Sequence, residues 1–271
     1  MHILIIEPFF EGSHKNWMEG LRKYSTYQYS FLTSDEKGSW RWKMQGGAKE
    51  LAEKFLTLPS KDFDLILASD MLDLPFFLSL TRHDINKTPV AMYFHENQIT
   101  YPQNKKDHKT QRNLELGLMN IKSALLSKEI FFNSHFHRQS FLKSIPELLK
   151  KFVCPHPKAE SIQKEITKKS KILHLGVELK KFHSKFIDKK ESQHPLILWN
   201  HRWEYDKNPD DFFKVLTELS HEGEKFSLCL LGKSIESTPY VFKKAKEELK
   251  NHIVYMGFCE SFEEYASWLQ S

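Results

Sequence analysis

The feature that most constrains the fold of this chain is a regular alternation of short apolar runs with longer amphipathic stretches. The apolar runs are rich in β-branched and aromatic residues and occupy residues 3–6, 65–68, 90–94, 130–132, 172–175, 196–199, 226–231 and 253–256. Segments with helical periodicity occupy residues 15–24, 47–55, 111–126, 137–142, 209–221, 240–249 and 260–269. Strands separated by helices predict βαβ units and a mainly parallel sheet, so the fold class is α/β.

A polar, lysine-rich stretch suggests where the chain divides. Residues 178–194 show no convincing apolar face, and a new strand is expected directly after Pro195. We therefore expect an N-terminal Rossmann-like domain over residues 1–180, a linker over 181–194 and a C-terminal domain over 195–271. Only about three strands are expected after Pro195, whereas a doubly wound domain usually has about five or six, so the second domain is expected to be incomplete and the chain truncated.

Composition excludes several classes of protein. The sequence is 40% hydrophobic and 28% charged, which is typical of a soluble globular protein. Its apolar runs stay far below the roughly 18 to 20 residues that cross a bilayer, and Glu7 comes too early for a signal peptide, so we expect a cytoplasmic protein that does not bind membranes. The cysteines, Cys154, Cys229 and Cys259, lack the paired spacing of a disulfide framework or a structural zinc site.

The balance of charge leaves the partner open. A net charge of +5 is compatible with a polyanionic partner and equally with none. Lysines cluster over residues 143–190, and a smaller group comprises Lys105, Lys106, His108 and Lys109. Taken alone, the larger cluster is interpreted as a solvated face around a linker.

The loop after the first expected strand is a candidate anion site. Gly12 and Ser13, followed by His14, stand between that strand and a helix, where backbone N–H groups point at a ligand. One glycine at such a turn is weak evidence, because a plain turn with a serine cap explains the same residues.

Polar residues also follow the expected strand at 90–94. His95, Glu96, Asn97 and Gln98 stand where open α/β sheets present their site residues. His95 could bind a hydroxyl group or transfer a proton, and Glu96 could pair with it. The alternative is a structural histidine beside a helix-capping glutamate. A zincin is excluded because Ile99 stands where a second metal-binding histidine would be required.

A third polar group follows the expected strand at 130–132. Asn133 or Ser134 is expected to cap the next helix. His135 and His137 do not share a helix face, so they are interpreted as surface histidines rather than metal ligands.

The strongest segment runs from Trp199 to Pro209. Arg202 and Lys207 follow an apolar strand and precede a proline that begins a helix, which is an arrangement suited to a leaving diphosphate. The alternative is a surface loop in which both cations pair with Glu204 and Asp206.

Together these motifs resemble one family. Gly-Ser-His at 12–14, Tyr-Phe-His-Glu-Asn-Gln-Ile-Thr-Tyr-Pro at 93–102, Phe-Asn-Ser at 132–134 and His-Arg-Trp-Glu-Tyr-Asp-Lys-Asn-Pro at 201–209 are similar to those of the tRNA-queuosine mannosyltransferases. That family consists of retaining glycosyltransferases of the GT-B type. The resemblance implies two Rossmann-like domains facing a cleft, a donor such as GDP-mannose and an acceptor hydroxyl on queuosine in tRNA.

The resemblance also implies roles for residues. Arg202 and Lys207 match the residues that hold the donor diphosphate, and His95 matches the histidine that contacts the transferred sugar. Gly12 and Ser13 match the loop near the donor phosphates and the acceptor. The remaining residues predicted to bind donor or acceptor are His14, Glu96, Asn97, Asn133, Ser134 and His201. The family's acidic donor-binding segment would lie beyond Trp268 and is missing here, which puts the contacts to the donor ribose in doubt.

The predicted reaction is hexose transfer with retention, without a metal or other cofactor and without an obligate protein partner. The lysines over 143–190 and Lys105, Lys106, His108 and Lys109 are then candidates for contacts with the tRNA backbone. Two alternatives stay open at this stage. One is a GT-B enzyme with a lipid or polysaccharide acceptor, and the other is a non-catalytic Rossmann protein that binds nucleotides or RNA.

Overall fold

The chain folds into two compact units. The computed structural model describes residues 1–35, 38–85, 87–102, 110–152, 158–183, 194–234 and 238–271. The N-terminal unit comprises residues 1–101 and 107–176, and the C-terminal unit comprises residues 102–106 and 177–271. Most of the linker expected over 181–194, and also Cys154, lies outside the described residues.

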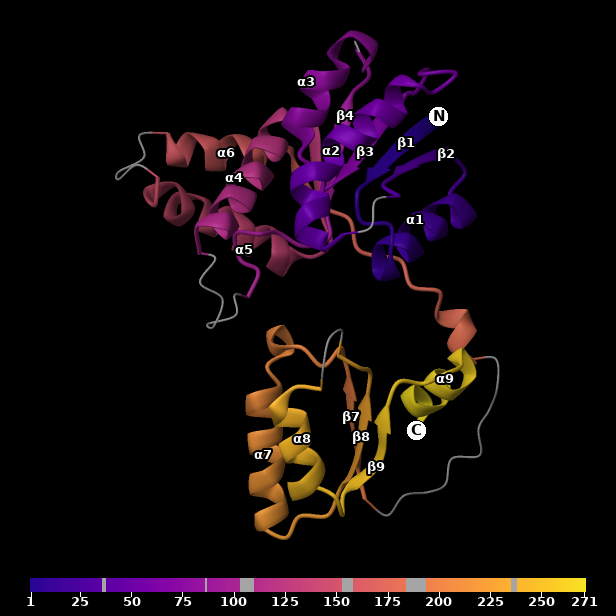
Figure 1. The fold of residues 1–271 in the computed structure, drawn as a ribbon, viewed down its shortest axis with the longest axis vertical. Helices are drawn as coiled ribbons and strands as arrows, with labels where there is room; N and C mark the ends of the chain where they lie inside the picture. Colours follow the sequence, from indigo (N-terminus) through magenta and orange to yellow (C-terminus); the bar gives the residue numbers. More distant parts are fainter. Residues whose placement is uncertain (36–37, 86, 103–109, 153–157, 184–193, 235–237) are drawn as a thin grey trace. The chain divides into compact units, whose positions relative to one another are not determined.

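The N-terminal unit is built on a parallel six-stranded sheet with the strand order β2-β1-β3-β4-β5-β6 (Figure 1). Its strands are β1 (His2–Glu7), β2 (Gln28–Thr33), β3 (Leu65–Ser69), β4 (Val90–Phe94), β5 (Glu129–Phe132) and β6 (Ser170–Ile172). Its helices are α1 (Gly12–Tyr24), α2 (Trp40–Leu56), α3 (Leu74–Ile85), α4 (Thr110–Leu126), α5 (His135–Lys150) and α6 (Ala159–Lys169). This is the expected α/β class.

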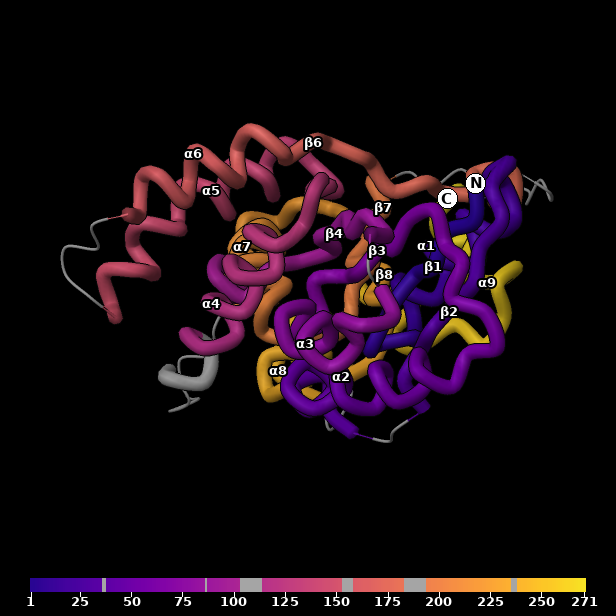
Figure 2. The backbone as a smooth tube through the Cα atoms, turned by 90° about the horizontal axis from the view of Figure 1, so that it is seen from above, coloured from indigo at the N-terminus to yellow at the C-terminus, as the bar shows by residue number. Residues whose placement is uncertain are grey.

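The sheet of the N-terminal unit is buried on both faces, because side chains alternate between the faces along each strand. In β1, Leu4 and Ile6 pack with α2 and α3 in one cluster. Ile3 and Ile5 pack in another cluster that includes residues of α1. Figure 2 follows the same helices along the backbone. Because helices cover both faces of the sheet, side chains on both faces of a strand are apolar, and the strands appear in the sequence as continuous apolar runs.

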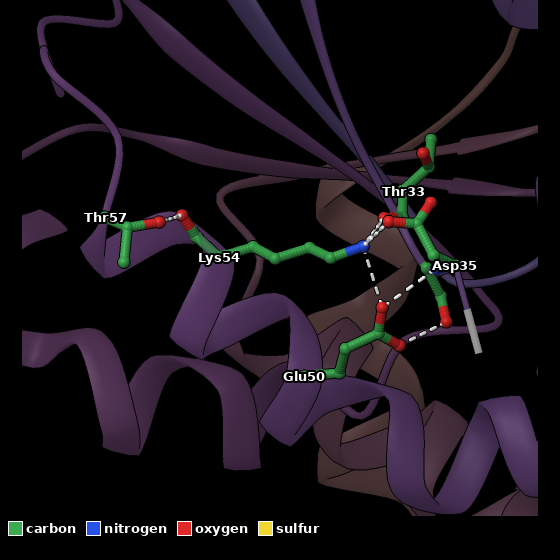
Figure 3. A network of polar contacts seen from close by, with 6 residues as sticks. Thr33, Asp35, Glu50, Lys54 and Thr57 are labelled. Atoms are coloured by element: carbon green, nitrogen blue, oxygen red, sulfur yellow. Dashed lines mark hydrogen bonds and ion pairs between the residues drawn. The ribbon is translucent and has the colours of Figure 1, made fainter.

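A polar network joins α2 to the end of β2 (Figure 3). The Lys54 ammonium donates to the Thr33 carbonyl at 2.9 Å and pairs with the carboxylates of Asp35 at 2.6 Å and Glu50 at 2.8 Å. Glu50 also accepts from the Asp35 amide. Burial raises the pKa of Glu50, but its hydrogen bonds to Lys54 and Ser34 outweigh this effect and lower it. The network therefore anchors an edge strand that no apolar pattern revealed.

The C-terminal unit has a parallel three-stranded sheet with the order β7-β8-β9. Its elements are β7 (Leu196–Asn200), α7 (Pro209–His221), β8 (Ser227–Leu231), α8 (Tyr240–Glu248), β9 (Ile253–Gly257) and α9 (Phe262–Gln270), with short 3-10 helices at Leu179–His183 and Tyr205–Lys207. Trp199, Trp203, Phe213 and Phe242 form an aromatic core on one face, where the rings of Trp203 and Phe242 stack 4.8 Å apart.

Most expected elements are confirmed, and the differences have physical reasons. The strand expected over 172–175 is β6, which begins at Ser170 and ends at Ile172. Helix α5 continues past Pro146 to Lys150, because Ile145, Leu148 and Leu149 keep its apolar face buried. Strand β2 and helices α3 and α6 were not expected from the sequence. None of the described helices has the length and apolar character needed to cross a membrane.

Candidate functional site

The polar loops of the N-terminal unit meet where its strand order reverses. Strands β1 and β3 are neighbours, and the chain leaves β1 toward β2 on one side and β3 toward β4 on the other. Open α/β sheets bind ligands outside the carboxyl ends of strands at this point. Glu7 ends β1, Asp70 follows β3 and His95 follows β4. The fold therefore gathers these three side chains at one edge.

A buried ion pair lies at the end of β1. The Glu7 side chain is fully buried, and its Oε1 accepts from the Phe9 amide at 2.8 Å. Glu7 Oε2 lies 2.9 Å from Nδ1 of His14, the third residue of α1. Burial lowers the pKa of His14, but the hydrogen bond and charge of Glu7, with the charges of Asp70 and Glu96, raise it to about 8. His14 is thus protonated at neutral pH.

His95 packs against this pair as a neutral ring. Its centroid lies 4.1 Å from that of His14 and 4.7 Å from the rings of Trp17 and Tyr93. Burial, then the charges of His14 and His137, lower the pKa of His95 to about 2. The Nε2 atom is buried and has no hydrogen-bond partner among the described residues. A neutral imidazole with an unused nitrogen can bind a hydroxyl group of a ligand.

Hydrogen bonds from side chains fix the backbone around His95. The His95 amide donates to Asp70 Oδ1 at 2.7 Å, and its carbonyl accepts from Asn133 Nδ2 at 2.7 Å. Asn120 accepts from the Gln98 amide and donates to the Asp70 carbonyl. The loop is therefore held by side chains from three other elements of the fold.

Asp70 is a site residue that the sequence analysis missed. Its side chain is fully buried, and Oδ2 has no partner among the described residues. Burial, followed by the charge of Glu96, raises the pKa of Asp70 well above its usual value. The signal was available, because Ser69 and Asp70 follow the expected strand at 65–68 just as His95 follows its own strand.

The loop residues near His95 and Gly12 have mainly structural contacts. Asn97 Oδ1 accepts from the amides of Ile99 and Thr100, and Glu96 accepts from the Gln98 side chain. Gly12 begins α1 with a φ of +51°, a conformation that favours glycine. The alternative of a serine cap at Ser13 is wrong, because the N-cap residue is Glu11 and its side chain makes no capping bond.

The loop after β5 confirms one expectation and corrects another. Ser134 caps α5 by accepting from the His137 amide at 3.1 Å. His135 is exposed, but His137 is buried, so its interpretation as a surface histidine is wrong. Its Nδ1 lies 3.0 Å from Asn133 Oδ1, and burial lowers its pKa to about 4. It faces inward because the first turn of α5 packs on Phe94 and Phe132.

Glu7, His14 and His95 also form a group that could hold a metal ion, since their ligand atoms lie within 4.8 Å of one another. In this structure Glu7 and His14 satisfy each other, and the proton on His14 would compete with a metal. We interpret the group as an ion pair beside a neutral histidine. That the protein acts without a metal ion at this group remains a prediction.

The C-terminal unit presents the second group of predicted residues after β7. Arg202 is exposed, and its side chain has no ion pair within the described part of the chain. Lys207 pairs with Asp206 at 2.8 Å, as the surface-loop alternative expects. The same loop also contains His201, whose exposed ring lies edge-on to Trp199.

Contacts with the neighbouring strand fix this loop. The Trp203 amide donates to the Lys233 carbonyl, and the Trp203 indole donates to the Leu231 carbonyl. Gly232 has a φ of +109°, and a Cβ atom there would lie 2.4 Å from the His201 carbonyl oxygen. Asn208 adopts a left-handed conformation and leads into Pro209 at the start of α7. Arg202 therefore extends from a firmly held backbone.

The pKa of His14 leads to a prediction about stability. A group whose pKa is raised by folding stabilises the folded state below its unfolded pKa of 6.5 and loses that effect as pH rises through about 8. We expect the free energy of unfolding to fall by about 2 kcal/mol over this range because of His14. Urea unfolding at pH 6 to 9 should show this fall for the wild type relative to His14→Gln.

Between pH 6.5 and 8, the pH dependence of stability caused by His14 is separate from that caused by the two neighbouring histidines. His95 and His137 have lowered pKa values, so their effects on stability occur below pH 6.5. Equal pH dependence in the wild type and in His14→Gln would contradict the buried ion pair.

Comparisons with known proteins give a consistent result. The family described as tRNA-queuosine alpha-mannosyltransferase N-terminal matches residues 2–177. A tRNA-queuosine alpha-mannosyltransferase of Drosophila melanogaster is 32% identical over 275 residues, which cover 99% of this chain and 71% of the relative.

Among solved structures, a trehalose-6-phosphate synthase has a TM-score of 0.57 at 12% identity, covering 97% of this chain and 74% of that one. A lipopolysaccharide outer core galactosyltransferase in its apo form has a TM-score of 0.51 at 12% identity, covering 98% of this chain and 71% of that one. At this identity the structures show the fold alone, which is that of the GT-B glycosyltransferases.

Proposed function

Because the chain belongs to the tRNA-queuosine alpha-mannosyltransferase family and is a glycosyltransferase with the GT-B fold, we propose that it transfers mannose from GDP-mannose to queuosine in tRNA with retention of configuration. The observation that carries the proposal is the match to the Drosophila relative across 99% of this chain. The site geometry supports the chemistry.

The proposed reaction exchanges one bond at the sugar. The bond from the anomeric carbon to the diphosphate breaks, GDP leaves, and the anomeric carbon bonds to the acceptor oxygen on the same face, with release of the hydroxyl proton. Arg202 and Lys207 stabilise the negative charge that develops on the diphosphate. This role suits Arg202 because its guanidinium is exposed and not engaged by a carboxylate among the described residues.

In this proposal His95 binds the sugar as a neutral group. Its buried Nε2 is free to bond a hydroxyl, while protonated His14 keeps a second charge off the His95 ring. Glu7, Asp70 and Asn133 position the two rings and the loop. Cations of the protein provide the charge stabilisation, so the proposal needs no resident metal.

The tRNA backbone is proposed to contact lysines of the N-terminal unit. Lys164 and Lys168 are exposed on α6. Lys150 and Lys171 are engaged in ion pairs with Glu147 and Glu129. Lys105, Lys106, His108 and Lys109, the other group expected to contact RNA, lie outside the described residues.

The test is transfer of radiolabelled mannose from GDP-mannose to matched tRNAs with and without queuosine. Label on the queuosine tRNA alone, released by an α-mannosidase, is the expected result, because GDP-mannose carries the α linkage and retention preserves it. Release by a β-mannosidase instead would overturn retention. Absence of label from both tRNAs, with folded protein, would overturn the donor or the acceptor, and other nucleotide sugars would then separate the two.

A further inference from the structure

An exposed aromatic side chain stands at the carboxyl edge of the N-terminal sheet, in the turn that follows β5. Phe136, in the first turn of α5, is 82% exposed. The next residue, His137, is buried on the other side of the same turn. The exposed ring gains nothing from packing within the fold, so it is available for contact with a ligand.

Two exposed imidazole rings and two exposed leucines lie in the turn of Phe136 and in the segment after β6, and the contact of His135 with His174 joins the two segments. His135 precedes Phe136, and its ring lies 6.2 Å from that of His174, which follows β6. Both histidines are exposed, as are Leu173 and Leu175, at 45% and 41%. We call Phe136, His135 and His174, with these leucines, the ring patch.

The ring patch is joined to the His95 loop through Asn133. The Asn133 carbonyl oxygen lies 2.9 Å from Nδ1 of His174, and its side chain donates to the carbonyl of His95. The side-chain oxygen of Asn133 lies 3.0 Å from Nδ1 of His137, in the turn that carries Phe136. One residue thus fixes both the patch and the histidine proposed to bind the sugar.

We propose that the ring patch stacks a nucleobase of the acceptor RNA and so places the acceptor near His95. Unpaired bases of RNA loops are recognised by stacking on phenylalanine and histidine rings, and stacking needs an exposed flat face such as that of Phe136. The patch contains no carboxylate, so it does not repel the phosphates beside the base. This inference rests on the proposed function, because it takes tRNA as the acceptor.

The test compares Phe136→Ala with Phe136→Trp in the transfer assay. Loss of one stacked base is expected to raise the KM for queuosine tRNA by about 5- to 150-fold in Phe136→Ala, with the KM for the donor unchanged, while Phe136→Trp keeps the wild-type value. Because the side chain is exposed, neither substitution should affect folding. Tyr24→Ala is the matched control, since Tyr24 is 61% exposed at the far end of α1.

The outcomes separate the two proposals. A wild type that labels no tRNA would overturn the proposed function itself. A wild type that labels queuosine tRNA, with Phe136→Ala as active at low tRNA concentration as Tyr24→Ala, would overturn the stacking role alone. A higher KM for the donor with an unchanged KM for tRNA would also overturn it, because Phe136 would then serve the donor site or a contact with the C-terminal unit.

Discussion

Replacement of Arg202 by Ala is expected to lower kcat for mannosyl transfer by about 10²- to 10³-fold, the usual effect of removing one group that stabilises charge in a transition state. The effect on the KM for tRNA should be small, because Arg202 is proposed to act on the leaving diphosphate. Initial rates with GDP-mannose and queuosine tRNA at several concentrations measure both constants.

Arg202 is a cleaner test than Lys207. Lys207 pairs with Asp206, whose side chain is 5% exposed, so Lys207→Ala would leave a nearly buried carboxylate without that cation and could disturb the loop. The exposed guanidinium of Arg202 can be removed while Trp203 keeps the backbone in place.

Lys214→Ala is the matched control, because Lys214 is an exposed cation on α7 of the same unit. It should have wild-type kcat. Arg202→Lys should retain part of the activity, since it keeps the charge but not the two-pronged geometry of the guanidinium. If Arg202→Ala turned over within about twofold of Lys214→Ala, Arg202 would have no part in diphosphate departure.

Most of the strands predicted from the sequence contain a continuous apolar run, and β2, which was missed, does not. Strand β4, fully buried, and helix α7, with Pro209 at its start, have the expected limits. Strand β2 was missed because it lies at the sheet edge with only Leu32 buried, and it lacks the continuous apolar run of a strand such as β4. Helix α3 was missed because its apolar residues are concentrated in its first half and give little helical periodicity. Both depend on tertiary packing rather than on a local pattern.

In the candidate site, too, the sequence predicted some features and missed others. Residues directly after an expected strand, such as His95 and Asn133, were placed correctly at the carboxyl edge. What the sequence could not show is which neighbours would meet. The support of His95 by Asp70 depends on the pairing of β3 with β4. The contact of the His95 ring with His14 depends on strand order, which brings β1 beside β3 although 57 residues separate their nearest ends, Glu7 and Leu65.

His95→Ala is expected to lower kcat by about 10²-fold or more, because it removes the neutral hydrogen-bonding group proposed to contact the transferred sugar. The change leaves a cavity beside His14 and Trp17, so some loss of stability is also expected. His95→Gln is the matched variant, since its amide can bond a hydroxyl while filling most of the space. It should recover part of kcat if hydrogen bonding is the role of His95.

The pH profile distinguishes a direct role from a structural one. His95 has a pKa near 2 and does not titrate in the working range, whereas the pKa of His14 is about 8, so a rate change near pH 8 is expected if protonated His14 supports the reaction. His95→Gln should therefore keep a rate change near pH 8. Glu7→Gln should move it to lower pH, because the charge of Glu7 and its hydrogen bond are the largest effects that raise the pKa of His14 against burial. A folded His95→Ala variant with wild-type kcat and this same profile would show that the sugar is bound without His95.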